Sequence, residues 1–309
     1  MILPNVNVAL VGIKNPEQWK TKVLKQRVIT AVVLLVTLLL ITTQLPPFEF
    51  AVAVAGLLML AATEWIGFVG LNEFKSRLFY LLTLVVLVVG AFFMLGISPS
   101  AESLPQDRVA IILLLGLLFW FLMFLLLGGY PGNQRTWNDK SKIATMGVLV
   151  LIPAWIGLVQ LKYLLDSGLL VVGLVLLTSS VDIGAYFAGV YFGDTKLVPA
   201  ISPKKSWEGV WGGALLCLLV SIGLIWSFNN TVLGLELVHI LLLLLLSLLI
   251  SIFSVIGDLF ESMLKRNNNL KDSSNLLPGH GGLLDRIDSL LAVTPVFVLT
   301  LMLVLGGVL

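Results

Sequence analysis

Long apolar stretches recur along this chain of 309 residues, from residue 28 to the C-terminus. A helix needs about 20 predominantly apolar residues to cross a hydrocarbon core ~30 Å thick, and each stretch approaches that length. Hydrophobic residues make up 58% of the sequence, which exceeds the apolar share of soluble domains. The sequence therefore predicts an all-α fold, a polytopic transmembrane helical bundle.

The hydropathy pattern predicts about nine spans, with long polar connections on one side of the membrane only. The expected spans are 28–45, 49–70, 78–98, 108–130, 143–161, 168–192, 209–228, 237–260 and 289–308. Residues 28–309 then form a single transmembrane domain. We expect residues 1–27 to be a cytoplasmic N-terminal segment without a signal peptide. Asn15 and Pro16 are expected to begin a helix there, which either lies on the membrane surface or only signals topology.

The basic residues predict the orientation of the bundle. If the N-terminus is cytoplasmic, all but two of the 19 lysines and arginines fall on the cytoplasmic side, the exceptions being Arg108 and Lys162. This distribution follows the positive-inside rule and favours N-in, C-out. The three long polar insertions, 130–142, 193–208 and 261–288, lie on the same side, so we expect any chemistry there. The single cysteine, Cys217, excludes an intrachain disulfide and a cysteine-based zinc site.

Charged residues are densest in residues 258–288, which we call the signature segment. If the helix of the eighth span continues, the spacing i, i+3, i+4, i+7 places four polar side chains on one face: Asp258, Glu261, Ser262 and Lys265. Asp285 and Asp288 are one turn apart at the start of the last span. If the two helix ends meet, Asp258 and Asp285 come together, and oxygen ligands favour Mg²⁺. We therefore expect a metal site of Asp258, Asp285 and Asp288, with a second cation left open.

Between these acids lies the glycine-rich turn Pro278-Gly279-His280-Gly281-Gly282, which leads directly into a helix. Backbone N–H groups at such a turn and at a helix N-terminus favour anions. Four bases could neutralise a polyphosphate there: Lys265, Arg266, Lys271 and Arg286. The alternative is a solvated loop whose bases only follow the positive-inside rule, and the acids at both helix ends argue against it.

The spacing Ser262-x-x-Lys265-Arg266, Lys271-Asp272, Pro278-x-His280-Gly281-Gly282-x-x-Asp285-Arg286-x-Asp288 resembles the signature of phosphatidate cytidylyltransferases, also called CDP-diacylglycerol synthases. Two further segments look similar to the same family. Asp182, Ala185, Tyr186 and Gly189 match its DxxAYxxG pattern, and residues 202–209 match its SPKKTWEG block with Ser206 in place of threonine. The resemblance implies a membrane nucleotidyltransferase of phospholipid biosynthesis. It would condense CTP with phosphatidic acid, giving CDP-diacylglycerol and pyrophosphate, with Mg²⁺.

The transmembrane domain would then be catalytic, with its active site on the cytoplasmic face of a prokaryotic plasma membrane. We expect catalytic roles for Asp182, Asp258, Lys265, Arg266 and Asp285. Substrate and phosphate binding is expected from Lys204, Lys205, Ser206, Ser262, Lys271, His280, Gly281, Gly282 and Arg286. The expected partners are the two substrates and the lipid bilayer, without nucleic acid, and a homodimer is left open.

Three points stay open at the level of the sequence. A related CTP-dependent lipid-alcohol kinase would share much of this pattern. An ion-coupled transporter is a more distant alternative, because acids within spans often line ion paths. Glu64, an acid near the end of the second span, fits a site role and a structural pair equally well.

Overall fold

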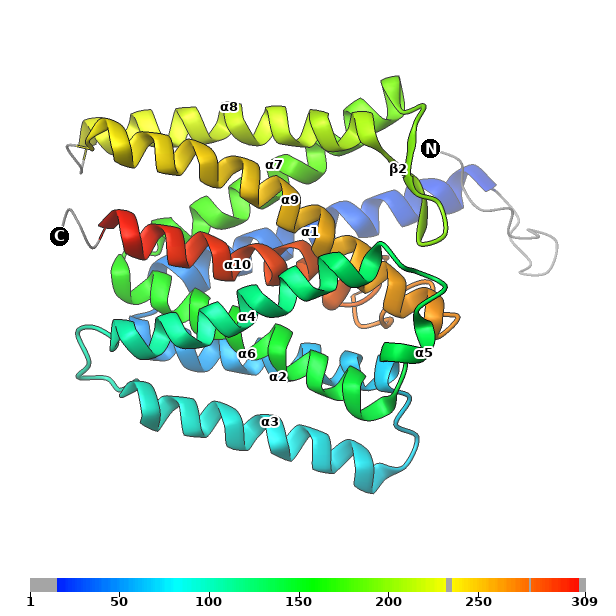
Figure 1. Ribbon diagram of the computed structural model, residues 1–309, viewed down its shortest axis with the longest axis horizontal. Coiled ribbons are helices and arrows are strands. Elements are labelled where there is room, and N and C mark those ends of the chain that lie inside the picture. Colours follow the sequence, from blue (N-terminus) through cyan, green and yellow to red (C-terminus); the bar gives the residue numbers. More distant parts are fainter. Residues whose placement is uncertain (1–15, 232–234, 278, 306–309) are drawn as a thin grey trace.

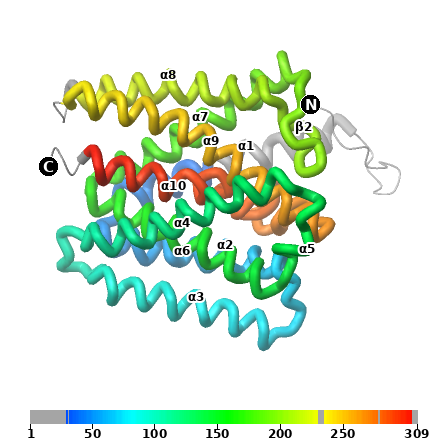
Figure 2. The backbone as a smooth tube through the Cα atoms, viewed as in Figure 1, coloured from blue at the N-terminus to red at the C-terminus, as the bar shows by residue number. Residues whose placement is uncertain are grey.

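The computed structural model describes residues 16–231, 235–277 and 279–305 as a bundle of long helices (Figures 1 and 2). The helices are α1 (Pro16–Gln44), α2 (Pro47–Val69), α3 (Phe74–Leu95), α4 (Gln106–Leu127), α5 (Gln134–Trp137), α6 (Lys140–Leu164), α7 (Leu169–Phe192), α8 (Trp207–Thr231), α9 (Leu237–Asn267) and α10 (Leu284–Leu305). The strands are β1 (Lys196–Val198) and β2 (Ser202–Ser206).

Eight of the described helices are long and apolar enough to cross a membrane, and they coincide with eight predicted spans. The remaining predicted span, 28–45, lies in α1, whose described apolar stretch is the shorter Val32–Gln44. Helix α1 begins at Pro16 and runs without a break into this stretch. Asn15 and the side chains of 16–28 lie outside the described residues, so the predicted surface helix stays a prediction. The all-α polytopic bundle is confirmed.

The two helices that carry the signature segment extend beyond the predicted spans. Helix α9 continues to Asn267 and α10 begins at Leu284, whereas the prediction ended one span at 260 and began the next at 289. Hydropathy alone ends a span where charges begin. Here charged side chains pair across the two helices, so both helices extend through them, and the connection 268–283 is shorter than the predicted insertion 261–288.

The helices are arranged around a central group, with α10 packed against α9, α6 and α4 (Figure 1). Helix α8 packs mainly on α7 and α9, while α3 lies at the edge of the bundle against α2 and α6. The contact between α7 and α8 depends on small residues. A Cβ atom built on Gly212 would lie 2.2 Å from Cβ of Ala188. As in other membrane bundles, small side chains let the backbones approach closely.

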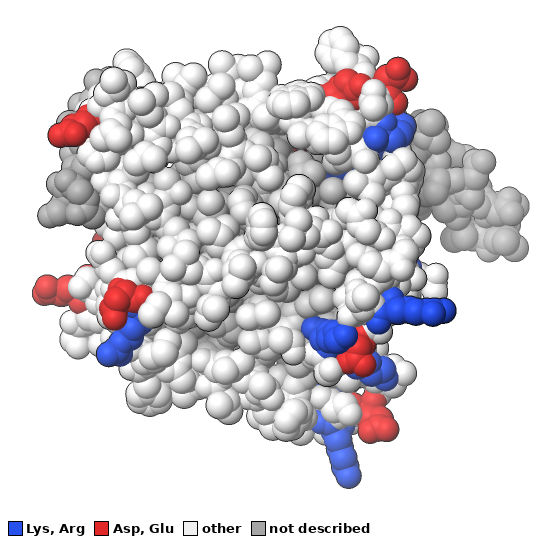
Figure 3. Space-filling model, in the orientation of Figure 1, with Lys and Arg blue, Asp and Glu red and all other residues white. Residues whose placement is uncertain are grey.

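The polar connections gather at one end of the bundle, which we call the site end; it lies at the right of Figure 1. It carries α5, the antiparallel hairpin β1–β2 and residues 268–283. The sequence predicted a polar insertion at 193–208 but no hairpin within it. Most of the lysine and arginine side chains visible in Figure 3 lie at this end, and the middle of that face is uncharged. This separation matches the charge asymmetry expected of a membrane protein.

At the opposite end, Lys162 is almost completely buried, with 1% of its surface exposed. Its Nζ donates to the carbonyl of Thr42, at 2.9 Å, and to that of Asp166, and so joins the C-terminal turn of α1 to the α6–α7 connection. Replacing Lys162 with methionine leaves both carbonyls without this donor. We expect a loss of about 2–4 kcal/mol in the free energy of unfolding. Thermal melting in detergent measures it, with the exposed Lys140→Met as the control on the same helix; equal melting temperatures would contradict this assignment.

Candidate active site

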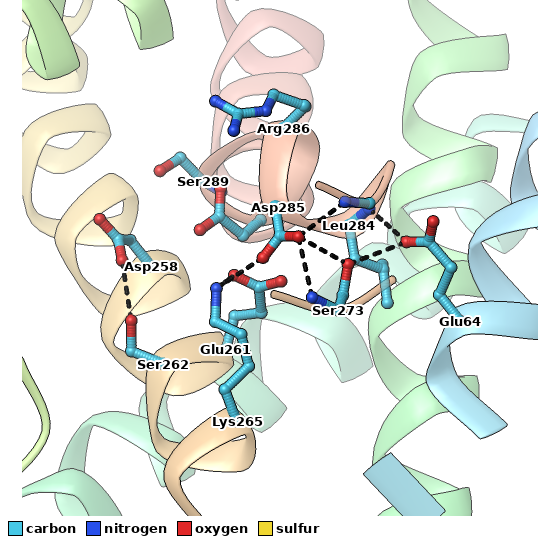
Figure 4. Close-up of polar contacts among 12 residues, drawn as sticks. Glu64, Asp258, Glu261, Ser262, Lys265, Ser273, Leu284, Asp285, Arg286 and Ser289 are labelled. Carbon is cyan, nitrogen blue, oxygen red and sulfur yellow. Dashed lines mark hydrogen bonds and ion pairs between the residues drawn. The ribbon is translucent and has the colours of Figure 1, made fainter. Parts of the chain in front are cut away.

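Helices α9 and α10 approach each other closely where the signature segment begins. A Cβ atom built on Gly257 would lie 2.5 Å from the carbonyl oxygen of Asp288, so only glycine permits this contact. The predicted continuation of α9 is confirmed, and its charged face looks toward the first turn of α10 (Figure 4). Lys265 lies between the helices, with its Nζ 2.7 Å from Oε2 of Glu261 and 2.7 Å from Oδ1 of Asp285. The two carboxylates thus share one ammonium group.

Asp285 also organises the loop that precedes it. Its Oδ2 accepts hydrogen bonds from the backbone N–H of Ser273 at 2.8 Å, from the Ser273 hydroxyl at 2.9 Å and from the N–H of Gly282 at 2.8 Å. The side chain is almost buried, with 7% of its surface exposed. Its Oδ1 oxygen accepts one bond from Lys265 and therefore keeps a second lone pair. Asp285 is both a structural centre and a group that could still bind a cation.

Glu64 of α2 holds the same loop from the other side (Figure 4). Its Oε1 accepts from the Ser274 hydroxyl at 2.6 Å and from the N–H of Leu283 at 2.8 Å. Its Oε2 accepts from the Ser273 hydroxyl at 3.1 Å and from the N–H of Leu284 at 2.8 Å. Glu64 therefore joins the N-terminus of α10 to residues 273 and 274. The structure thus places Glu64 in contact with the signature segment.

A second group of acids lies around Lys205, on strand β2. The Nζ of Lys205 is 2.7 Å from Oδ2 of Asp258, whose Oδ1 accepts from the Ser262 hydroxyl at 3.2 Å. The charges of Asp258 and Lys205 both act on Asp182 of α7 and on Asp288 of α10. We call Asp182, Asp258 and Asp288 the acidic cluster. The sequence predicted Asp285 as the neighbour of Asp258; the structure instead gives Asp258 and Asp285 a lysine each.

The glycine-rich turn donates a backbone hydrogen bond to the carboxylate of Asp285 in this structure. The N–H of Gly282 donates to Asp285, and Gly281 has a φ of +85°, a conformation that favours glycine. A Cβ atom on Gly282 would lie 1.9 Å from Oγ of Ser273. Arg286 donates from Nε to the carbonyl of His280 at 3.1 Å and so closes the turn. Pro278 lies outside the described residues. Phosphate binding at His280, Gly281 and Gly282 stays a prediction.

The other predicted binding residues fall into two groups. Lys204 and Lys271 are exposed at the site end. Arg266 and Ser206 have structural contacts: Arg266 donates from Nε to the carbonyl of Ile201 at 3.4 Å, and Ser206 Oγ accepts the N–H of Gly209 at 3.2 Å. Ser206 is buried and caps the N-terminus of α8 in the way a serine commonly does. Its predicted role in substrate binding is untested.

An apolar cavity of about 320 Å³ opens beside the acidic cluster, between α1, α2, α6, α7 and α10. Leucine, valine and isoleucine side chains form most of its wall. Its polar part consists of Asp182, Arg286, Ser289 and a few further serine and threonine hydroxyl groups. A cavity with an apolar wall and a charged end fits a ligand that is itself amphiphilic.

Two serines were not among the predicted site residues; of two acids, Glu64 was left open and Glu261 was given no role in the site. Ser273 and Ser274 hold Glu64 and Asp285 in place, but serines in a polar loop give no specific signal. Glu261 was placed on the correct face of α9, and its pairing with Lys265 follows from the i, i+4 spacing. Glu64 did carry a signal, because a carboxylate near the end of a span is costly unless it is hydrogen-bonded.

Known proteins that are similar in sequence identify the family of this chain. A family model described as the cytidylyltransferase family matches residues 25–304. A phosphatidate cytidylyltransferase of Pseudomonas aeruginosa is 42% identical over 275 residues, which cover 89% of this chain and 95% of that protein. One of Haemophilus influenzae is 37% identical over 286 residues, or 89% of this chain and 97% of that protein. The chain belongs to the cytidylyltransferase family.

Proposed function

We propose that this chain condenses CTP with phosphatidic acid to give CDP-diacylglycerol and pyrophosphate. The observation that carries the proposal is the convergence of three separate segments, 182–189, 202–209 and 258–288, at one end of a membrane bundle beside an apolar cavity. A phosphate oxygen of phosphatidic acid attacks the α-phosphorus of CTP. The bond from that phosphorus to the β-phosphate oxygen breaks, and pyrophosphate leaves. A phosphomonoester is largely ionised near neutral pH, so the attack needs no strong general base.

Both reactants are anions, so the protein must chiefly reduce charge repulsion and align the two phosphates. Lys205 is held by Asp258, and Lys265 by Glu261 and Asp285, and these ion pairs fix the position of both lysines. Lys204 and Arg266 are the sequence neighbours of these two lysines, and both are exposed at the site end. These four bases bind the triphosphate in our proposal, with Lys271 and the turn at His280 contributing from the loop.

Magnesium fits the donor chemistry of this site. Three carboxylates, those of Asp258, Glu261 and Asp285, pair with two lysines there, and Asp182 and Asp288 lie within the electrostatic influence of Lys205 and Asp258. One oxygen of the buried Glu261, Oε1, has no hydrogen-bond partner among the described residues. No three acidic, histidine or cysteine side chains in the described part of the chain form a ready-made metal cage. Mg²⁺ commonly uses only one or two carboxylates and completes its shell with water and substrate phosphates.

In our proposal Mg²⁺ is held by one or two of the three carboxylates of Asp258, Asp285 and Asp288, and a second cation is left open. Bound Mg²⁺ would neutralise charge on the CTP phosphates. Asp182 keeps a catalytic role in our proposal, because it lies both in the acidic cluster and at the wall of the apolar cavity, where the two substrates would meet.

The cavity is our proposed site for the diacylglycerol part of phosphatidic acid. Its wall offers acyl chains an apolar surface, and Arg286 at its polar end suits the lipid phosphate. CTP comes from water at the site end, where the hairpin and residues 268–283 lie. Because CTP is a cytosolic nucleotide, we place the site end at the cytoplasmic face, with N-in, C-out topology. The bacterial relatives favour the plasma membrane.

Labelled nucleotides test the reaction directly. Purified protein is incubated in phosphatidate-containing micelles with CTP labelled at the α- or the γ-phosphate, with and without Mg²⁺. We expect Mg²⁺-dependent transfer of the α-label to lipid, and release of the γ-label as pyrophosphate. Transfer of the γ-label to a lipid alcohol, with CDP as product, would instead establish a lipid kinase. Folded protein that labels no lipid from either substrate would contradict both enzymes and leave transport as the function to examine.

A further inference from the structure

Glu64 accepts four hydrogen bonds although it comes from a helix far from the signature segment in sequence. The donors are two hydroxyls and two backbone N–H groups, those of Ser273, Ser274, Leu283 and Leu284. Only 5% of the residue is exposed. Glu64 accepts hydrogen bonds from backbone N–H groups at the start of α10, and such groups have no acceptor within the helix. A negative charge at this position is also stabilised by the helix dipole.

The pattern of donors requires a carboxylate. Each oxygen of Glu64 accepts one hydroxyl and one backbone N–H: Oε1 from Ser274 and Leu283, Oε2 from Ser273 and Leu284. A hydroxyl can turn and become an acceptor, but a backbone N–H cannot. In a glutamine at this position, the amide nitrogen would face one of the two N–H groups in either orientation. That contact sets donor against donor.

Ser273 connects Glu64 to the site. Its hydroxyl lies 3.1 Å from Oε2 of Glu64 and 2.9 Å from Oδ2 of Asp285, and its single hydrogen can serve only one of them at a time. Its backbone N–H donates to Asp285 as well. Glu64 therefore fixes Asp285 in two ways, through Ser273 and through the first turn of the helix that carries Asp285.

We propose that Glu64 is a positioning residue for the nucleotidyl transfer. It does not touch the reacting atoms; it holds residues 273 and 274 and the start of α10 so that Asp285 and Lys265 stay aligned. This inference rests on the proposed catalytic role of Asp285. It predicts that a change at Glu64 acts on turnover by the folded enzyme, because a small displacement of aligned groups costs much of the rate.

The test compares Glu64→Gln, Glu64→Asp and Ser273→Ala in the α-labelled CTP assay, with kcat expressed per folded protein well below the melting temperature. Glu49→Gln is the matched control, an exposed glutamate on the same helix. We expect Glu64→Gln to lower kcat by about 10-fold or more, with KM for CTP changed less than about threefold. Glu64→Asp, which keeps both oxygens, should recover part of the loss. In the Ser273→Ala background, Glu64→Gln should cost less than in wild type, because the two residues act together.

A purely structural Glu64 would lower the melting temperature and leave kcat per folded protein unchanged, and that result overturns the proposal. If Glu64→Gln does not fold, Ser273→Ala decides: a lowered kcat supports the proposal, and wild-type kcat refutes it. Failure of the proposed function is a different result, because the wild-type enzyme itself would then label no lipid.

Discussion

Asp285→Asn should reduce the formation of α-labelled CDP-diacylglycerol by at least about 100-fold, the scale of losing a key electrostatic group from an active site. The carboxylate accepts from Lys265 on Oδ1 and from three donors of Ser273 and Gly282 on Oδ2. An asparagine has one acceptor oxygen. Its NH₂ group would therefore face either the ammonium group or two backbone N–H groups. Either orientation disrupts the pairing of Lys265 or the geometry of the loop, and the proposed cation loses a charged ligand.

The measurement is the initial rate of lipid labelling in micelles at saturating CTP and Mg²⁺, together with a melting curve. Glu73→Gln serves as control, since it removes an exposed carboxylate at the start of α3, where the side chain makes no capping bond. We expect the melting temperature of Asp285→Asn to fall too, because Asp285 holds the loop. A folded Asp285→Asn enzyme with the rate of the control would remove Asp285 from the mechanism.

The sequence predicted the bundle well because the bilayer restricts what an apolar segment can become. Length and hydropathy located eight of the described helices, and most of their ends lie within a few residues of the predicted span ends. The larger errors came at α9 and α10, which extend to Asn267 and back to Leu284. Charges can stay within a helix when partners from another helix neutralise them. Such pairing depends on tertiary contacts that hydropathy does not contain.

The candidate site shows the same limit at the level of single residues. The i, i+4 spacing was enough to place Glu261 and Lys265 side by side on α9. The sequence could not tell which acid of α10 approaches Asp258, because Asp285 and Asp288 are one turn apart and the choice depends on how α10 is rotated. Nor could it show that Glu64 reaches Leu283 and Leu284, since nothing in a local pattern relates segments so far apart.

Adjacent lysines illustrate what the structure adds. Lys204 and Lys205 look equivalent in the sequence, but successive side chains of a strand point to opposite faces. Both lie on β2. Lys205 reaches Asp258, at 2.7 Å, while Lys204 is exposed. The two lysines therefore differ: Lys205 neutralises an acid of the site, and Lys204 is exposed at the site end.

Lys205→Met should consequently lower kcat/KM for CTP by about 100-fold. The substitution removes the positive charge from the acidic cluster, so repulsion between these acids and the triphosphate increases. The same excess of negative charge should strengthen the binding of a divalent cation, and the Mg²⁺ concentration for half-maximal rate should fall. Stability should change little, because the ion pair is partly exposed, with 23% of the Lys205 side chain and 36% of the Asp258 side chain accessible.

The opposite directions of the two effects make the prediction specific. General damage to the site would weaken CTP and Mg²⁺ together, whereas the loss of one charge should weaken the anion and favour the cation. Lys196→Met, on the exposed part of the same hairpin, is the matched control and should leave both parameters unchanged. Lys205→Arg keeps the charge and should retain more activity than Lys205→Met. If Lys205→Met instead raised the Mg²⁺ requirement, Lys205 would not be the group that balances the acidic cluster, and the proposed cation site would have to lie away from Asp258.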